Sequence, residues 1–283
     1  MLLAGLVLAA GQAPAEELVW RAGAPQPDLP EQVGPGYVRI TIDSDGGTSG
    51  SLTVFRLREG ATIAEFAEIS DRIDQAFMEG GDVVAAFEEA LALVDVVAEV
   101  TADADERRSV GVVLTEGRYA LEYLPDEEGP RQRVYHELMV EGSPGAAAAP
   151  VPDATIQFVD FAFAIPPDLR AGEQTWHVIN RGSQLHHMVI FSLADGATLE
   201  EFMEFMQQME TEGPPGADGE NGEAIAAPYD YIGIASTGEE SYHILDFEAG
   251  QYVAICFMPD HRGEATGQPH FMLGMVQVFR VGD

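Results

Sequence analysis

One stretch of the chain occurs twice, as Leu57-Arg-Glu-Gly-Ala-Thr-Ile-Ala-Glu-Phe66 and, 136 positions later, as Leu193-Ala-Asp-Gly-Ala-Thr-Leu-Glu-Glu-Phe202. Further along, residues 100–119 align without gaps with residues 233–252, at an offset of 133. Matches that keep the same order along a chain indicate duplication of a whole structural unit. The sequence therefore predicts two copies of one domain.

A segment of small residues and proline separates the two copies. It reads Gly142-Ser-Pro-Gly-Ala-Ala-Ala-Ala-Pro-Val-Pro152 and has no apolar periodicity, which is typical of a linker. We place the first domain at residues 16–143, the linker at 144–152 and the second domain at 153–283.

Each copy has the same order of predicted elements. Short β-rich segments separated by glycine turns favour antiparallel strands. The pairs Thr62 with Glu65 and Thr198 with Glu201 have the spacing of a capping box, which predicts a helix within each copy. We expect a mostly β fold of two tandem β-sandwiches, each with a helical insertion.

The charge of the chain restricts its partners. Asp and Glu number 48 against 14 Lys and Arg, which gives a formal net charge of −34. A surface this acidic repels phosphate backbones and anionic lipids, so we exclude nucleic-acid binding as the main activity. Only one cysteine is present, so no disulfide can form within the chain.

The start of the chain resembles an export signal. Residues 1–10 are almost entirely apolar, and the small-residue segment Gln12-Ala-Pro-Ala15 follows them. Such a run is too short to span a bilayer. We expect residues 1–15 to direct export to an extracytoplasmic location, with no membrane span in the mature chain; a buried N-terminal strand is the alternative.

The side chains suited to metal binding gather in the second copy. His187 is expected to begin a strand, Cys256 to end one, His270 to lie in a loop and Met275 to open the last strand. A thiolate, two imidazoles and a thioether form a soft ligand set that suits copper above other first-row metals. The sequence therefore predicts one copper ion in the second copy.

The spacing of these residues resembles the ligand pattern of the cupredoxins, the small blue copper proteins. The similar segments are Asn180-x-Gly-x4-His187, Gly250-x-Tyr-x3-Cys256 and His270-x4-Met275. The resemblance implies Greek-key β-sandwiches and a type 1 copper site with His187, His270 and Cys256 as ligands and Met275 as a weak axial ligand. By the repeat, the first copy has Ser51, Val134 and either Tyr123 or Glu122 at the three main positions, so we expect it to bind no metal.

Two other histidines compete for the site. Thirteen residues separate Cys256 from His270, more than is usual in the family, and His261 lies within that insertion. We favour His270, because Met275 follows it at a suitable distance and because the polar neighbours of His261 indicate a solvated loop. His186 should face the opposite side of its strand from His187, so we expect it not to be a ligand.

The pattern favours one-electron transfer to a redox partner protein. The alternatives are a metal-free interaction protein and a copper trafficking or storage protein. An enzyme is less expected, because oxidases and nitrite reductases of this class carry histidine beside the type 1 cysteine, whereas Ile255 and Phe257 flank Cys256 here. The oligomeric state is left open.

Overall fold

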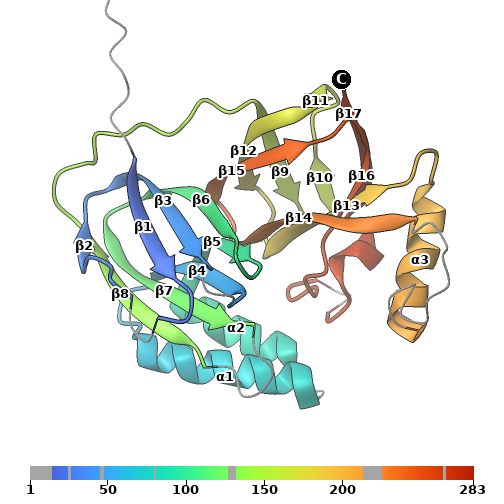
Figure 1. The fold of residues 1–283 in the computed structure, drawn as a ribbon. Helices are drawn as coiled ribbons and strands as arrows, with labels where there is room; N and C mark the ends of the chain where they lie inside the picture. The colour runs from blue at the N-terminus through green and yellow to red at the C-terminus, as the bar shows by residue number, and fades with distance from the viewer. Residues whose placement is uncertain are drawn as a thin grey trace, which may run out of the picture.

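A computed structural model describes residues 15–24, 27–44, 48–79, 81–126, 132–212, 225–263 and 266–283 (Figure 1). The predicted export segment, residues 1–15, lies outside these ranges except for Ala15. No helix among the described residues is long and apolar enough to cross a membrane.

The two halves of the chain, residues 16–143 and 153–283, carry matching elements. The N-terminal half contains β1 (Glu16–Arg21), β2 (Gln32–Val33), β3 (Gly36–Asp43), β4 (Gly50–Leu57), α1 (Ile63–Glu79), α2 (Val83–Leu93), β5 (Val94–Ala102), β6 (Arg107–Leu114), β7 (Gly117–Pro125) and β8 (Val134–Val140). The C-terminal half contains β9 (Ala154–Val159), β10 (Ala162–Ala164), β11 (Leu169–Arg170), β12 (Gly172–Asn180), β13 (His186–Leu193), α3 (Leu199–Glu212), β14 (Ala226–Ala235), β15 (Glu240–Phe247), β16 (Gly250–Ile255), the 3-10 helix η1 (His270–Leu273) and β17 (Val276–Gly282). The predicted mostly β fold, with helices inserted after β4 and β13, is confirmed.

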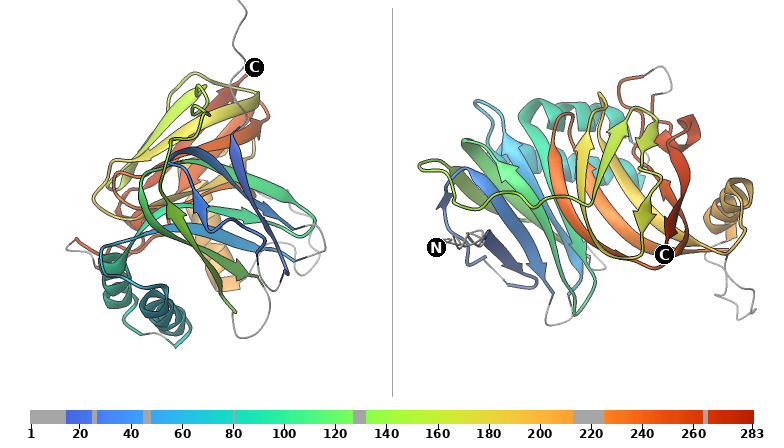
Figure 2. Two further views of the ribbon diagram at one scale, coloured as in Figure 1. Left: turned by 90° about the vertical axis from the view of Figure 1, so that its left-hand side faces the viewer. Right: turned by 90° about the horizontal axis from the view of Figure 1, so that it is seen from above.

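Three sheets build the molecule. One five-stranded sheet, β2-β8-β7-β4-β5, belongs to the N-terminal half, and another, β11-β17-β16-β13-β14, belongs to the C-terminal half. Both pack against a single seven-stranded sheet of order β1-β3-β6-β15-β12-β9-β10, in which β6 pairs with β15 across the two halves (Figure 2). Each half thus has its own five-stranded sheet, and the two halves are joined through the seven-stranded sheet.

The helices begin where the repeated sequence predicts. In each half the threonine hydroxyl accepts a hydrogen bond from the glutamate amide at 3.2 Å, and the glutamate carboxylate accepts one from the threonine amide. These reciprocal bonds satisfy N–H groups that the first helical turn leaves without partners. The pairs Thr62–Glu65 and Thr198–Glu201 are therefore real capping boxes.

Strands β13 and β16 are buried on both faces. Their even-numbered side chains, such as Ile190 and Ala254, point into the sandwich core together with Cys256, Trp176 and Phe247. Their odd-numbered side chains pack in a second core against α3, formed by residues that include Phe191, Leu193, Val253, Ile255, Phe202 and Phe205. Because side chains alternate along a strand, residue parity decides which core a side chain enters.

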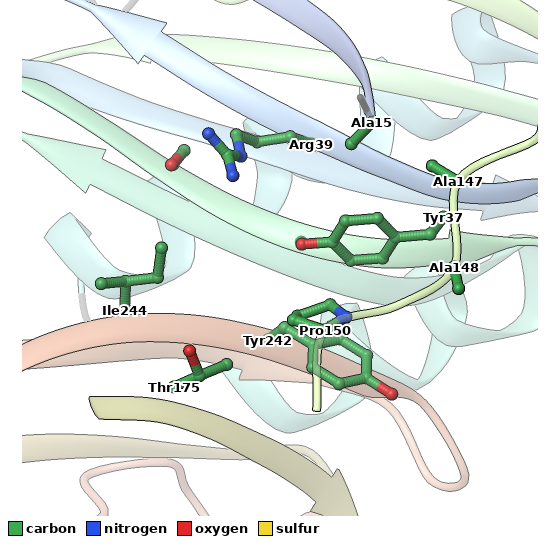
Figure 3. A pocket seen from close by; sticks show the side chains of 11 residues that line it. Ala15, Tyr37, Arg39, Ala147, Ala148, Pro150, Thr175, Tyr242 and Ile244 are labelled. Atoms are coloured by element: carbon green, nitrogen blue, oxygen red, sulfur yellow. The ribbon is translucent and has the colours of Figure 1, made fainter. Parts of the chain in front are cut away.

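The connection between the halves lies against the shared sheet. Strand β8 ends at Val140 and β9 begins at Ala154, and the segment between them runs from the N-terminal half to the C-terminal half (Figure 1). Figure 3 shows Ala147, Ala148 and Pro150 lining a hollow of about 180 Å³ beside Tyr37 and Tyr242. The two tyrosine rings meet edge to face at 5.7 Å across the two halves.

Candidate metal centre

Three fully buried side chains from distant parts of the C-terminal half converge. His186 begins β13, Cys256 directly follows β16, and His270 begins η1; each is 0% exposed. The Nδ1 atoms of the two histidines are 3.0 Å apart, and Cys256 Sγ is 3.5 Å from His270 Nδ1. Within the described ranges this is the one group of three His, Cys, Asp or Glu side chains arranged to hold a metal ion.

The loop before His186 is shaped by the motif Asn180-x-Gly182. Asn180 Nδ2 donates to the carbonyls of Gln184 at 2.7 Å and Ala235 at 2.8 Å, and its Oδ1 accepts from Gly182 N at 2.9 Å. A Cβ at Gly182 would stand 2.5 Å from both Asp160 Oδ1 and His186 Nε2. Asparagine therefore fixes the loop, and glycine leaves the space that the His186 ring requires.

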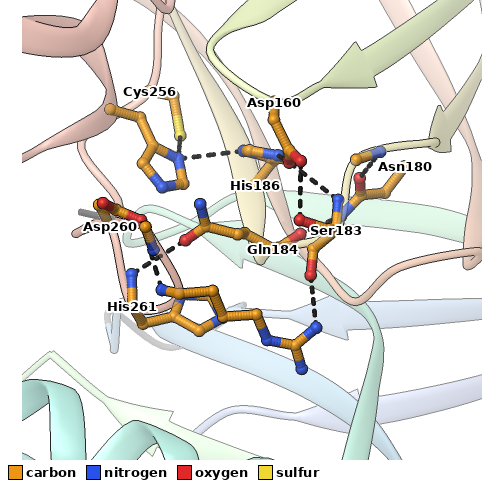
Figure 4. Close-up of polar contacts among 12 residues, drawn as sticks. Asp160, Asn180, Ser183, Gln184, His186, Cys256, Asp260 and His261 are labelled. Atoms are coloured by element: carbon orange, nitrogen blue, oxygen red, sulfur yellow. Dashed lines mark hydrogen bonds and ion pairs between the residues drawn. The ribbon is translucent and has the colours of Figure 1, made fainter. Parts of the chain in front are cut away.

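Asp160, in the turn between β9 and β10, orients His186. Its Oδ1 lies 3.0 Å from His186 Nε2, and Ser183 donates to the same carboxylate through N at 2.8 Å and Oγ at 2.7 Å (Figure 4). Burial raises the pKa of Asp160, but the hydrogen bonds from Ser183 and His186 outweigh it and leave this pKa below its usual value. The carboxylate is thus charged and accepts the Nε2 proton, which directs the His186 Nδ1 lone pair toward the cluster.

Backbone hydrogen bonds hold the two ends of the Cys256–His270 loop together. Cys256 N donates to Met275 O at 3.1 Å, His270 N donates to Met258 O at 2.8 Å, and Phe271 N donates to Cys256 O at 2.9 Å. The two ligand-bearing ends are therefore fixed by main-chain contacts that do not depend on the sequence of the insertion.

Burial sets the protonation of the metal-free cluster. It raises the pKa of the Cys256 thiol to about 11, and it is the main cause that lowers the pKa of His270 to about 4. It also lowers the pKa of His186, although Asp160 opposes this shift. Near neutral pH the cluster therefore holds two neutral imidazoles and a thiol.

These donors fit a single soft metal ion. His186 keeps its proton on Nε2, so the 3.0 Å hydrogen bond between the two Nδ1 atoms requires a proton on His270 Nδ1. His270 Nε2 has no hydrogen-bond partner among the described residues. An ion that replaced this proton would meet two imidazole nitrogens and one thiolate at once. Two histidines and one cysteine form the trigonal set of blue copper centres.

The structure brings His186 into the cluster, whereas the sequence analysis expected His187 there. His187 lines a separate pocket beside the start of α2, where its Nε2 accepts a hydrogen bond from Phe257 N at 2.8 Å. Burial is the main cause that lowers the pKa of His187 to about 3. The pairing of Ile190 with Ala254 puts even-numbered residues of β13 on the Cys256 face, so His186 takes the inward position.

The structure also places the other residues that the sequence analysis considered as ligands. Cys256 and His270 lie together as expected, and fully buried Met275 belongs to the same core as Cys256. His261, expected in a solvated loop, is only 2% exposed, and its backbone N–H donates to Gln184 Oε1 at 2.9 Å. It lies outside the three-residue cluster.

The equivalent place in the N-terminal half is filled by an aromatic ring. In the C-terminal half, Val189 pairs with Ile255, and continuing this register by one residue sets Met188 opposite Cys256. In the N-terminal half, Leu52, the counterpart of Met188, pairs with Tyr123. Gly50 stands at the His186 position, and a Cβ there would lie 2.8 Å from the Tyr123 ring. Of the two candidates left open by the repeat, Tyr123 is therefore the counterpart of Cys256.

No protein-family model and no curated protein sequence matches the chain. Among solved structures, the chain is similar to auracyanin A, a "blue" copper protein of Chloroflexus aurantiacus, with 19% identity and a TM-score of 0.27, over 45% of this chain and 96% of that one. An auracyanin of Roseiflexus castenholzii matches with 17% identity and a TM-score of 0.29, over 46% and 95% of the two chains. The blue copper oxidase of Nitrosomonas europaea matches with 12% identity and a TM-score of 0.24, over 96% and 77%.

The fold and its cluster agree with the resemblance seen in the sequence. Each half contains a five-stranded sheet with a helical insertion at the same point, after β4 or β13. The predicted Cys256 and His270 meet in the C-terminal half. The chain thus has the mostly β fold with helical insertions that its sequence predicts, and a buried His–Cys–His cluster in the C-terminal half.

Proposed function

We propose that this chain binds one copper ion through His186, Cys256 and His270 and transfers single electrons. The observation that carries the proposal is the convergence of two Nδ1 atoms and one Sγ atom in a fully buried position. Bound copper would supply the redox couple Cu(I)/Cu(II). Met275 is proposed as the weak axial ligand, because it is buried in the same core and its backbone oxygen accepts from Cys256 N.

The protein contributes a site that changes little between the two oxidation states. Asp160 holds one imidazole, and main-chain hydrogen bonds hold Cys256 and His270. Ligands that are fixed before the ion arrives need little rearrangement during electron transfer, and outer hydrogen bonds tune the metal.

The charge of the chain and the residues beside Cys256 suit an electron carrier. The net charge of −34 would attract a basic redox partner and accelerate its encounter. Ile255 and Phe257, which flank Cys256, belong to the apolar core beneath α3, so they offer no ligand toward a second metal. Export and the partner protein are parts of this proposal.

A titration with Cu(II) tests the proposal. We expect one equivalent of copper to produce an intense thiolate-to-copper absorption in the visible spectrum. Cys256→Ser should abolish the absorption, and His186→Ala should abolish or strongly alter it. His187→Gln is the matched control, because it changes the neighbouring imidazole on the opposite face.

Each other outcome favours a different ligand or a different function. Loss of the absorption in His187→Gln but not in His186→Ala would return the ligand role to His187. A colourless wild-type protein without tight copper would contradict the proposal and favour a metal-free interaction protein. Tight binding of Cu(I) without the Cu(II) absorption would favour copper trafficking or storage.

A further inference from the structure

A second site lies in the N-terminal half, on the face of its five-stranded sheet that α1 and α2 cover. A pocket of about 200 Å³ opens there between β4, β5 and β7 on one side and the two helices on the other. Two residues of the C-terminal half, Leu185 and Ile234, complete its wall. The C-terminal half therefore closes part of the pocket.

Most of the pocket wall is apolar. Phe55 and Phe66 meet in it with ring centroids 4.6 Å apart, and Phe87 and Leu91 of α2 add further apolar surface. A cavity of about 150 Å³ lined by apolar side chains is known to hold benzene. The pocket thus has room for a single ring with a short substituent.

The polar part of the wall contains two acidic side chains. Glu99 and Glu122 line the pocket together with a single cation, Arg133. That cation is already engaged: Arg133 lies 2.6 Å from Asp74, and 3.4 Å from Glu122. Glu99 Oε2 accepts hydrogen bonds from two neutral groups, the hydroxyl of Tyr231 at 2.8 Å and the backbone amide of Ile234 at 3.2 Å.

Glu99 is therefore the carboxylate without a cationic partner among the contacts of the pocket. Burial raises the pKa of Glu99 and is also the main cause that raises the pKa of Glu122, to which the charge of Glu99 adds. A half-buried carboxylate of this kind is stabilised when a positive group comes within a few ångströms.

We propose that the pocket binds a small organic cation, a single aromatic ring that carries a primary ammonium group. The ring would pack against Phe55 and Phe66, and the ammonium group would pair with Glu99. The site does not depend on copper. An occupant would nevertheless touch Leu185, which directly precedes His186, so the two sites adjoin.

Calorimetric titration of the metal-free protein with benzylammonium chloride tests the proposal. We expect saturable binding to wild type and no comparable binding of benzoate or benzyl alcohol, which keep the ring but change the charge. Glu99→Gln should weaken binding roughly tenfold or more, because one charge-assisted hydrogen bond is lost.

Filling the pocket provides a second, independent test. Ala90 of α2 lines the pocket and is 5% exposed, so Ala90→Phe should abolish binding, whereas Ala92→Phe on the exposed side of the same helix should not. Ala90→Leu is the smaller filler if Ala90→Phe does not fold, as judged by circular dichroism. Equal binding of benzyl alcohol, or unchanged binding in both Glu99→Gln and the filled variant, would overturn the proposal.

Discussion

The carboxylate of Asp160 offers the sharpest test of the metal centre. Asp160→Ala removes the 3.0 Å contact to His186 Nε2 and the two hydrogen bonds from Ser183 at 2.7 and 2.8 Å. Loss of such an outer partner typically weakens metal binding about 10–100-fold, which corresponds to roughly 1.4–2.7 kcal/mol. The metal-free protein should also lose about 1–2 kcal/mol of stability, less than three full hydrogen bonds, because Asp160 is partly exposed to solvent.

Ser183→Ala is the matched control, because it removes the 2.7 Å bond to Asp160 and leaves the contact with His186 in place. Copper affinity should be measured by competition with a chelator, and stability by urea unfolding, for both variants and wild type. Asp160→Ala should weaken copper binding far more than Ser183→Ala does. If the two variants bound copper within twofold of wild type, Asp160 would not orient His186 and the reasoning would fail.

Two further predictions concern the loop and the buried histidines. Gly182→Ala should destabilise the protein by about 1–3 kcal/mol and weaken copper binding, because its Cβ would lie 2.5 Å from His186 Nε2. Gly250→Ala is the control, because a Cβ there would make only an ordinary contact, 3.9 Å from the Tyr252 ring. Equal chelator-competition and urea results for the two variants would contradict the clash. Burial is the main cause that lowers the pKa values of His187 to about 3 and of His243 to about 4. Because the unfolded chain protonates these side chains near pH 6.5 and the folded chain does not, stability should fall as pH drops from about 6.5 toward 4, by up to about 1.4 kcal/mol per pH unit for each histidine. Urea unfolding of the metal-free protein at pH 7 and pH 5 measures this loss, and identical midpoints would refute it.

Local features of the sequence were sufficient to predict the elements. The capping boxes at Thr62 and Thr198 act over four residues, so they mark helix starts without knowledge of the fold. The pairing of β6 with β15 is different, since it joins residues more than a hundred positions apart and depends on which strands reach the edge of a sheet. That contact could not be predicted from the repeat alone.

In the candidate site, too, local sequence features predicted some residues, while others depend on long-range contacts. The spacing around Cys256 and His270 identified two members of the cluster, but the choice between His186 and His187 depends on which face of β13 is inward. Apolar cores cover both faces of that strand, so hydrophobic alternation does not distinguish them. The deciding contact is the pairing of β13 with β16, which joins distant segments. The burial of His261 likewise depends on a long-range contact, with Gln184.

The sheet shared by the two halves has a consequence for how the chain unfolds. One apolar core contains Phe55 and Phe66 from the N-terminal half as well as Ile156 and Trp176 from the C-terminal half. Separating the halves would expose that core and leave β6 and β15 as unpaired edges, which are templates for aggregation. The duplicated chain should therefore melt in one cooperative transition, and either half produced alone should associate with other chains through its open edge.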